Sequence, residues 1–225
     1  ACKGPATEPP STEPPPTEPP TEDTAVPTPI PTAATGDTGP DIPVIDCTAL
    51  PTGGFQHQPV PGARGYHGLA FGEDATIVGS DGSSLIKAVD FGDASLFVPN
   101  VGSLEQMEYL PSGELVASEG FGGILGIMPS GATRTIATNV GAYGVLVGPD
   151  GLIYASNQSR VLRIDPVTGD SEVYIDMPGV APKVANFSPD LSTFYFGTNG
   201  NQGRVYQVPV DANFDPVGDP VVLGS

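Results

Sequence analysis

Short apolar runs separated by polar turns recur four times between residue 65 and the end of the 225-residue chain. The runs alternate or cluster in fours to sixes and lack the 3.6-residue spacing of a helix, so they indicate strands. The turn positions are 38, 38 and 40 residues apart: Glu73, Pro111, Pro149 and Pro189. A strand-rich repeat of about forty residues with Gly, Pro and Asp turns is typical of a β-propeller blade. The sequence therefore predicts an all-β fold.

Each repeat divides into a four-stranded blade, and we expect blades at 65–103, 104–143, 144–183 and 184–225. The innermost strand comes first, at 68–71, 106–109, 144–147 and 184–187. The second strand follows at 76–79, 114–117, 152–155 and 193–197, and the third at 84–89, 123–128, 160–164 and 204–208. The Asp150-Gly151 pair between two of these runs is a strong hairpin signal.

The number of blades is the open question in this fold. Propellers with blades of this length commonly have more than four, and the ring must close. We expect the four repeats to be part of a six-bladed ring, of which two or more blades are missing here. The alternative is that the lead-in segment 42–64 supplies closing strands for a compact ring of four or five blades.

Residues 1–41 have a different composition, dominated by near-repeats of Thr, Glu and Pro (TEPPSTEPPPTEPPTE). Proline fixes φ and removes hydrogen-bond donors, and the acidic residues repel one another, so a disordered, extended stalk is expected. Cys2 followed by this stalk resembles the mature start of a bacterial lipoprotein. That resemblance implies a signal peptide, lipidation of Cys2 and an exported protein at the cell envelope or outer surface. A secreted protein with an ordinary Cys2 is the alternative.

The formal net charge of −18, with only eight Lys and Arg, excludes nucleic acid as a partner because phosphates could not be neutralised. No run approaches the roughly 20 apolar residues of a membrane span. We therefore expect membrane contact only through a lipid anchor at Cys2.

Two stretches carry a family resemblance: VLVGPDGLIYASNQSRVLRIDPVTGD and VANFSPDLSTFYFGTNGNQGRVYQVPVD. They resemble the senescence marker protein/gluconolactonase/luciferin-regenerating family of six-bladed propellers, and NHL-type propellers share the same Pro-Asp-Gly turn. The resemblance implies one divalent cation, usually Ca²⁺, in the central channel. In that family a Glu, an Asn and an Asp, each just before an innermost strand, hold the ion, which polarises a lactone carbonyl.

The corresponding positions in this chain are candidates to line the channel: His67, Glu105, Tyr143 and Lys183. Glu105 alone is a hard anionic ligand and is the candidate metal ligand, whereas a lysine beside it would oppose a cation. A second ring of polar positions follows the second strands: Asp81, Glu119, Asn157 and Asn199. These side chains either line a face that binds a cation or a sugar, or cap the backbone of the next loop.

These observations predict an exported, surface-tethered propeller that binds a protein or small-molecule ligand. No cofactor is expected, and Ca²⁺ is the one to test. The alternative is a Ca²⁺-dependent lactonase or esterase of the gluconolactonase type, with catalytic residues that the sequence does not identify. A structural or adhesive surface module is a third hypothesis.

Overall fold

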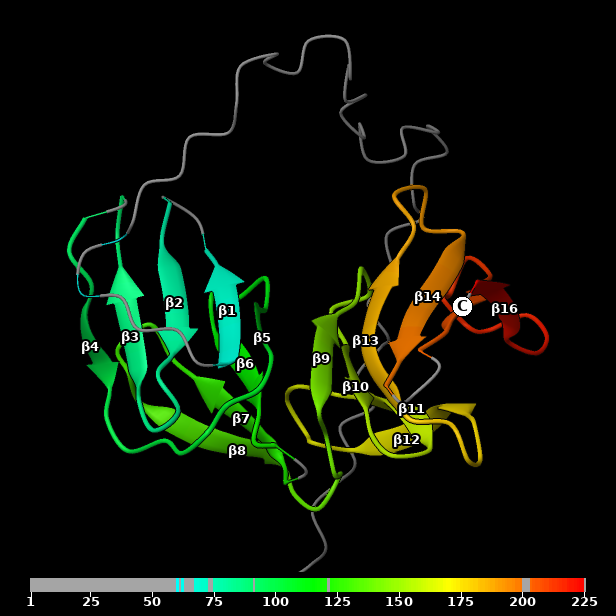
Figure 1. Cartoon of the computed structure of the whole chain (residues 1–225), viewed down its shortest axis with the longest axis horizontal. Helices are drawn as coiled ribbons and strands as arrows, with labels where there is room; N and C mark the ends of the chain where they lie inside the picture. Colours follow the sequence, from blue (N-terminus) through cyan, green and yellow to red (C-terminus); the bar gives the residue numbers. More distant parts are fainter. Residues whose placement is uncertain are drawn as a thin grey trace, which may run out of the picture. The chain divides into compact units, whose positions relative to one another are not determined.

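The computed structural model describes residues 60, 62, 67–72, 75–90, 92–120, 122–199 and 203–224 (Figure 1). The chain divides into two units, 1–41 and 42–225, and all described residues belong to the second. The expected stalk, the lipidation at Cys2 and nearly all of the lead-in segment 42–64 lie outside the described residues.

The described residues form sixteen strands in four antiparallel four-stranded sheets. The first sheet holds β1 (His67–Phe71), β2 (Ile77–Ser80), β3 (Leu85–Ala88) and β4 (Ser95–Val98). The second holds β5 (Met107–Tyr109), β6 (Leu115–Ser118), β7 (Ile124–Ile127) and β8 (Thr133–Ala137). The third holds β9 (Gly144–Val147), β10 (Ile153–Ser156), β11 (Arg160–Ile164) and β12 (Ser171–Asp176). The fourth holds β13 (Pro182–Phe187), β14 (Thr193–Thr198), β15 (Val205–Pro209) and β16 (Val221–Gly224).

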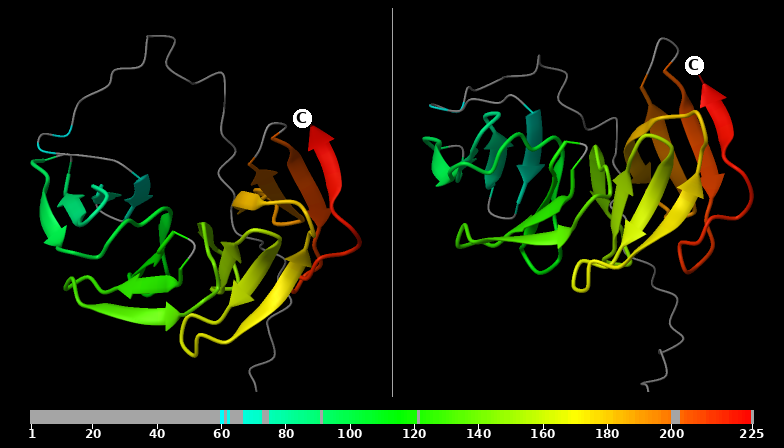
Figure 2. Two further views of the ribbon diagram at one scale, coloured as in Figure 1. Left: turned by 60° about the horizontal axis from the view of Figure 1, so that its bottom comes forward. Right: turned by 90° about the horizontal axis from the view of Figure 1, so that it is seen from below.

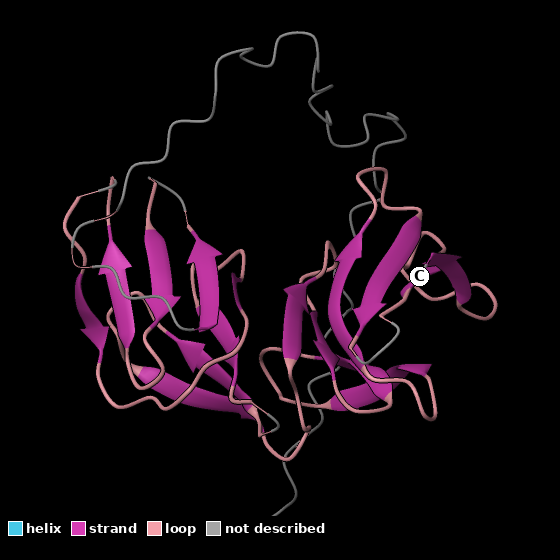
Figure 3. Cartoon of the chain, viewed as in Figure 1, coloured by secondary structure: helices cyan, strands magenta, loops and turns pink. Residues whose placement is uncertain are grey.

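Each sheet is one blade, with its strands paired in chain order. The first strands of successive blades, β1, β5, β9 and β13, contact one another in turn (Figure 2). Between the strands the described chain forms loops and turns and no helix (Figure 3). None of the described residues forms a helix with the length and hydropathy of a membrane span. The predicted all-β propeller of four-stranded blades is confirmed, and a six-bladed ring stays a prediction.

Three apolar cores hold the blades together, and each spans one boundary between neighbouring blades. Val78 and Leu85 of the first blade pack with Leu115 and Ile127 of the second. The next two cores join the second blade to the third and the third to the fourth in the same way. A single blade could not bury these side chains by itself, so the fold depends on stacking.

Arg134, paired with the buried carboxylate of Glu114 in its own blade, fastens the second blade to the third. Arg134 on β8 donates from Nε and Nη2 to the two carboxylate oxygens of Glu114, over 2.7 and 2.9 Å. The same Nη2 donates to the Pro166 carbonyl of the third blade over 2.7 Å. Gly126, paired with Arg134, leaves the space that the Glu114 carboxylate occupies.

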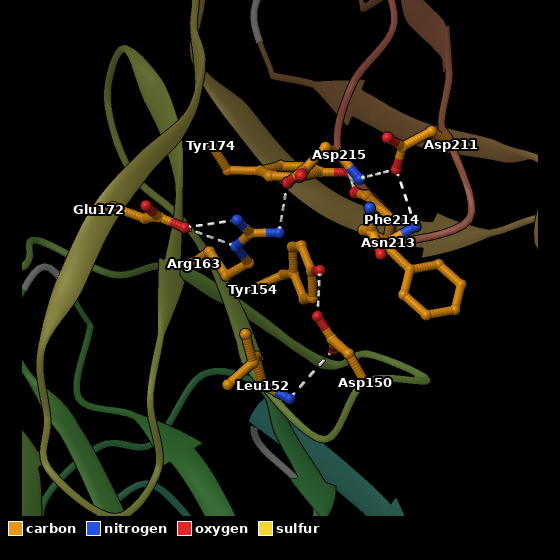
Figure 4. A network of polar contacts seen from close by, with 10 residues as sticks. All are labelled: Asp150, Leu152, Tyr154, Arg163, Glu172, Tyr174, Asp211, Asn213, Phe214 and Asp215. Carbon is orange, nitrogen blue, oxygen red and sulfur yellow. Dashed lines mark hydrogen bonds and ion pairs between the residues drawn. The ribbon is translucent and has the colours of Figure 1, made fainter. Parts of the chain in front are cut away.

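A larger network fastens the third blade to the fourth (Figure 4). Arg163 on β11 donates to Glu172 of its own blade over 2.7 Å and to Asp215 of the fourth blade over 2.8 Å. Its guanidinium lies over the ring of Tyr174, whose hydroxyl donates to the Phe214 carbonyl over 2.7 Å. Burial, followed by the hydrogen bond to Asp150, raises the pKa of the Tyr154 hydroxyl in this network.

Candidate functional site

The four channel candidates come together as two pairs at the same end of the first strands, and we call them the channel set. His67 begins β1, and its Nδ1 lies 3.0 Å from Oε2 of Glu105, which precedes β5. Lys183, on β13, places its Nζ 3.7 Å from the centre of the Tyr143 ring, just before β9. A cation at this distance from an aromatic face is attracted by the ring quadrupole.

Buried serines at the ends of the second strands position the channel set. The Ser118 hydroxyl donates to the Tyr143 carbonyl over 2.6 Å, and the Ser156 hydroxyl donates to the Lys183 carbonyl over 2.8 Å. Each hydroxyl also accepts an N–H from its own blade: that of Gln106, just before β5, and that of Gly144, which begins β9. Each serine therefore links its own first strand to the channel residue of the next blade.

These serines were missed at the sequence level, although a signal for them exists. The predicted second strands end at Gly79, Ala117 and Ala155, whereas the structure extends each of them to the following serine: Ser80, Ser118 and Ser156. All three are buried, and Thr198 ends the second strand of the fourth blade. The available signal was that all four repeats carry a hydroxyl residue, serine or threonine, at the same position.

The charges of the channel set influence one another. Burial lowers the pKa of the Lys183 ammonium, and the negative charge of Glu105 partly opposes that effect. The two pairs therefore lie within electrostatic reach of each other, and together they carry both signs of charge. The Glu105 side chain is only 16 % exposed, whereas His67 is 39 % exposed, so a ligand would reach the pair from the histidine side.

A hollow of about 380 Å³ lies beside Glu105, at the ends of β1, β5 and β9. Gly68 forms part of its wall and has a φ of +57°. A Cβ at this position would come 2.9 Å from the Glu105 carbonyl, so only glycine allows β1 to approach the neighbouring chain this closely.

The channel set does not fit a Ca²⁺ site. Calcium takes six to eight oxygen ligands, commonly including several carboxylates. The set offers one carboxylate, in contact with His67, and adds a lysine ammonium to the same cluster. No group of three His, Cys, Asp or Glu able to hold a metal is found within the described part of the chain.

Two members of the second polar ring hold the loops that follow them. Asp81 accepts the N–H groups of Ser83 and Ser84, over 3.0 and 2.8 Å. Asn157 accepts those of Ser159 and Arg160 and donates its amide to the Val140 carbonyl over 3.2 Å. Their oxygens are thus engaged in shaping turns.

The backbone N–H groups of the other two members of this ring are also hydrogen-bonded. The Glu119 N–H donates to the Gly123 carbonyl, and the Asn199 N–H donates to the Ala181 carbonyl. Both residues are exposed. The second ring is therefore a set of loop-forming positions in which Glu119 leaves an exposed carboxylate.

The fold occurs in several known proteins. The gluconolactonase XC5397 from Xanthomonas campestris aligns with a TM-score of 0.63 and 16 % identity, over 72 % of this chain and 64 % of that one. A nidogen/laminin complex aligns with a TM-score of 0.60 and 18 % identity, over 71 % of this chain and 64 % of that one. The virginiamycin B lyase from Staphylococcus aureus aligns with a TM-score of 0.57 and 18 % identity, over 72 % of this chain and 56 % of that one. The architecture is that of the β-propellers.

These similarities define the fold and leave the function open. No family model matches the sequence, and no curated protein matches it. The chain covers less than two thirds of the length of these solved structures. A gluconolactonase, a lyase and a nidogen/laminin complex share this architecture, so function must be argued from the channel set.

Proposed function

We propose that this chain is an exported, surface-tethered propeller that binds a small-molecule or protein ligand at the channel set. The observation that carries the proposal is the pairing of His67 with Glu105 and of Lys183 with Tyr143. The cluster presents a carboxylate, an ammonium, an imidazole and an aromatic face beside a hollow. Such groups recognise polar ligands by hydrogen bonds and charge.

Lys183 is the residue on which ligand binding depends most. Its ammonium group is partly desolvated, and a ligand carboxylate or hydroxyl would restore the interactions that burial removes. Glu105 and His67 would accept and donate hydrogen bonds on the opposite side of the cluster. The export and the tether rest on the sequence of residues 1–41 and on the resemblance of Cys2 to a lipoprotein start.

The second candidate is a Ca²⁺-dependent lactonase or esterase of the gluconolactonase type. It is favoured by Glu105, a hard anionic side chain at one of the positions just before the innermost strands, which is where the resembled family carries its metal ligands. The fold shared with a gluconolactonase is compatible with this activity. The lysine in the same cluster argues against it, because it would repel a divalent ion.

The two candidates are separated by calorimetric titration of the full chain with Ca²⁺, combined with thermal unfolding. A ligand that binds the folded state must raise the melting temperature. We expect no Ca²⁺ binding and no thermal shift. Tight binding to one site, lost in Glu105→Gln, would overturn the proposal and establish the metal site that a lactonase requires.

The binding function itself is tested by thermal shift against a panel of sugars, sugar acids and amino acids. We expect at least one compound to stabilise the wild-type chain and to lose this effect in Lys183→Met. Arg160→Met, which removes the cation of an exposed ion pair outside the channel set, is the control. Hits that bind Lys183→Met as well as the wild type would place the site elsewhere.

A further inference from the structure

A groove of about 710 Å³ opens between the first and second blades, at the end of the first strands opposite the channel set. Its first-blade side carries Lys87 and Phe97, and its second-blade side carries Tyr109 and the turn Pro111–Gly113. Phe71 and Glu108 lie toward its inner end, with Val147 of the third blade. This volume is in the range of pockets that enclose small organic ligands.

At the other two blade boundaries, charged side chains of the protein occupy the corresponding place. Arg163 holds the position in the third blade that Lys87 holds in the first. Each lies on the third strand of its blade, opposite a residue of the second strand: Tyr154 for Arg163 and Val78 for Lys87. Arg163 lies over Tyr174 and is neutralised by Glu172 and Asp215. In the second blade this position is Gly126, and the space is filled by the Glu114–Arg134 pair.

Lys87 has the aromatic contact of Arg163 but not its carboxylates. Its Nζ lies 5.1 Å from the centre of the Phe97 ring, which corresponds to Tyr174. The strand partner of Lys87 is Ser95, where Arg163 has Glu172. No carboxylate among the described residues lies within 4.0 Å of the Lys87 ammonium. Of the three described blade boundaries, the one with the groove is therefore the one whose cation, Lys87, has no carboxylate partner among the described residues.

We propose that this groove is a binding site for a small aromatic carboxylate, whose anionic group takes the place of the missing Glu and Asp beside Lys87. The aromatic body of the ligand packs between Phe97 and Tyr109, which offer ring faces and edges on the two sides of the groove. The ligand completes the same arrangement of cation, aromatic ring and carboxylate that the chain itself supplies between its third and fourth blades.

Glu108 fixes which way the ligand points. Its Oε2 accepts the Val147 N–H over 2.7 Å, so this half-buried carboxylate is held in place at the inner end of the groove. A second carboxylate next to it would be repelled. The anionic group of the ligand therefore lies toward Lys87, and a ligand hydroxyl or N–H group can donate to Glu108.

The test measures binding of 3-phenylpropionate, indole-3-acetate and 4-hydroxybenzoate to the full chain by saturation-transfer NMR and calorimetry. A charge-assisted contact corresponds to roughly tenfold or more in Kd. We expect at least one acid to bind and to weaken by about tenfold or more in Lys87→Met. The matching neutral amide should bind the wild type about as weakly as the acid binds Lys87→Met. Arg160→Met, which removes the cation of an exposed ion pair in the third blade, is the control and should leave the Kd unchanged.

A second variant tests the groove without changing its charge. Ser112→Trp, at an exposed position on the groove wall, should block binding while Lys87 stays in place. The proposal is wrong if none of the three acids binds in the millimolar range. It is equally wrong if the amide binds as well as the acid, or if Lys87→Met and Ser112→Trp both bind like the wild type. Because the variants lie away from the channel set, failure here leaves the proposed channel function standing.

Discussion

The replacement Arg134→Met tests whether polar contacts between blades stabilise this propeller. Methionine keeps the unbranched length of the side chain and removes its three short contacts, two to Glu114 and one to the Pro166 carbonyl. It leaves Glu114 as a charged group that is only 8 % exposed, with no cation beside it. The variant thus creates a buried, uncompensated carboxylate at a blade boundary.

The expected cost follows from the burial of the pair. Breaking a fully buried ion pair by removing one partner costs about 3–5 kcal/mol. The Arg134 side chain is 34 % exposed, so water screens part of the interaction and the lower end of that range, about 3 kcal/mol, applies. For a domain of this size, about 3 kcal/mol corresponds to a fall in Tm of roughly 6–12 °C.

Urea unfolding followed by circular dichroism measures this cost, provided that the slope of the transition is unchanged. Arg160→Met is the matched control, because Arg160 and Asp176 are 3.8 Å apart and both about half exposed. Such an exposed pair contributes about 0–1 kcal/mol. Adding Glu114→Leu to Arg134→Met should recover part of the loss, since the buried charge is then gone. A cost no greater than that of the control, or a double variant less stable than Arg134→Met, would refute this reasoning.

Two further predictions concern other polar positions. Ser156→Ala should lower the free energy of unfolding by about 1–3 kcal/mol, because the Lys183 carbonyl and the Gly144 N–H lose a buried partner. Urea unfolding measures this loss. The control Ser171→Ala, at an exposed position, should change the free energy of unfolding by less than about 0.5 kcal/mol. Burial raises the pKa of Glu108 above 4.5, with the Val147 hydrogen bond opposing, so the folded state binds this proton more tightly than the unfolded one. The wild type should therefore gain stability relative to Glu108→Gln as the pH falls from 7 to just above 4.5, where the folded state takes up this proton. A difference in Tm between the two proteins that is the same at pH 7 and pH 5 would contradict this prediction.

The fold could be predicted because its signal is local and repeated. Each blade carries the same apolar runs and turn residues, and the strand pairs β9–β10 and β10–β11 occur where the runs and the Asp150-Gly151 turn indicated them. The strand ends differ by a residue or two. At Ser118 and Ser156 the strand continues through a polar residue because its hydroxyl is buried and hydrogen-bonded across the blade boundary.

The arrangement of the candidate site could be predicted only in part. The repeat pattern identifies His67, Glu105, Tyr143 and Lys183 as equivalent positions, but their pairing depends on the rotation between blades, which no local pattern contains. The contact of Lys183 with the Tyr143 ring and the charge interaction with Glu105 both join residues of different blades. Arg134 and Arg163 also have partners in the next blade, Pro166 and Asp215, which lie 32 and 52 residues away and could not be predicted for the same reason.

The three blade boundaries explain why the fold can persist while its sites change. At each of them the apolar core is similar, and Val78, Val116 and Tyr154 are all buried in it. The residues that pair with them on the third strands are Lys87, Gly126 and Arg163, respectively. A groove lies beside Lys87, the Glu114–Arg134 ion pair beside Gly126, and a network of charges around Arg163. The apolar packing recurs at all three boundaries, whereas the polar positions beside it differ from one boundary to the next. Similarity to known propellers at 16–18 % identity therefore indicates where the strands lie. The ligands have to be identified by binding experiments that compare the wild type with variants of Lys183 and Lys87.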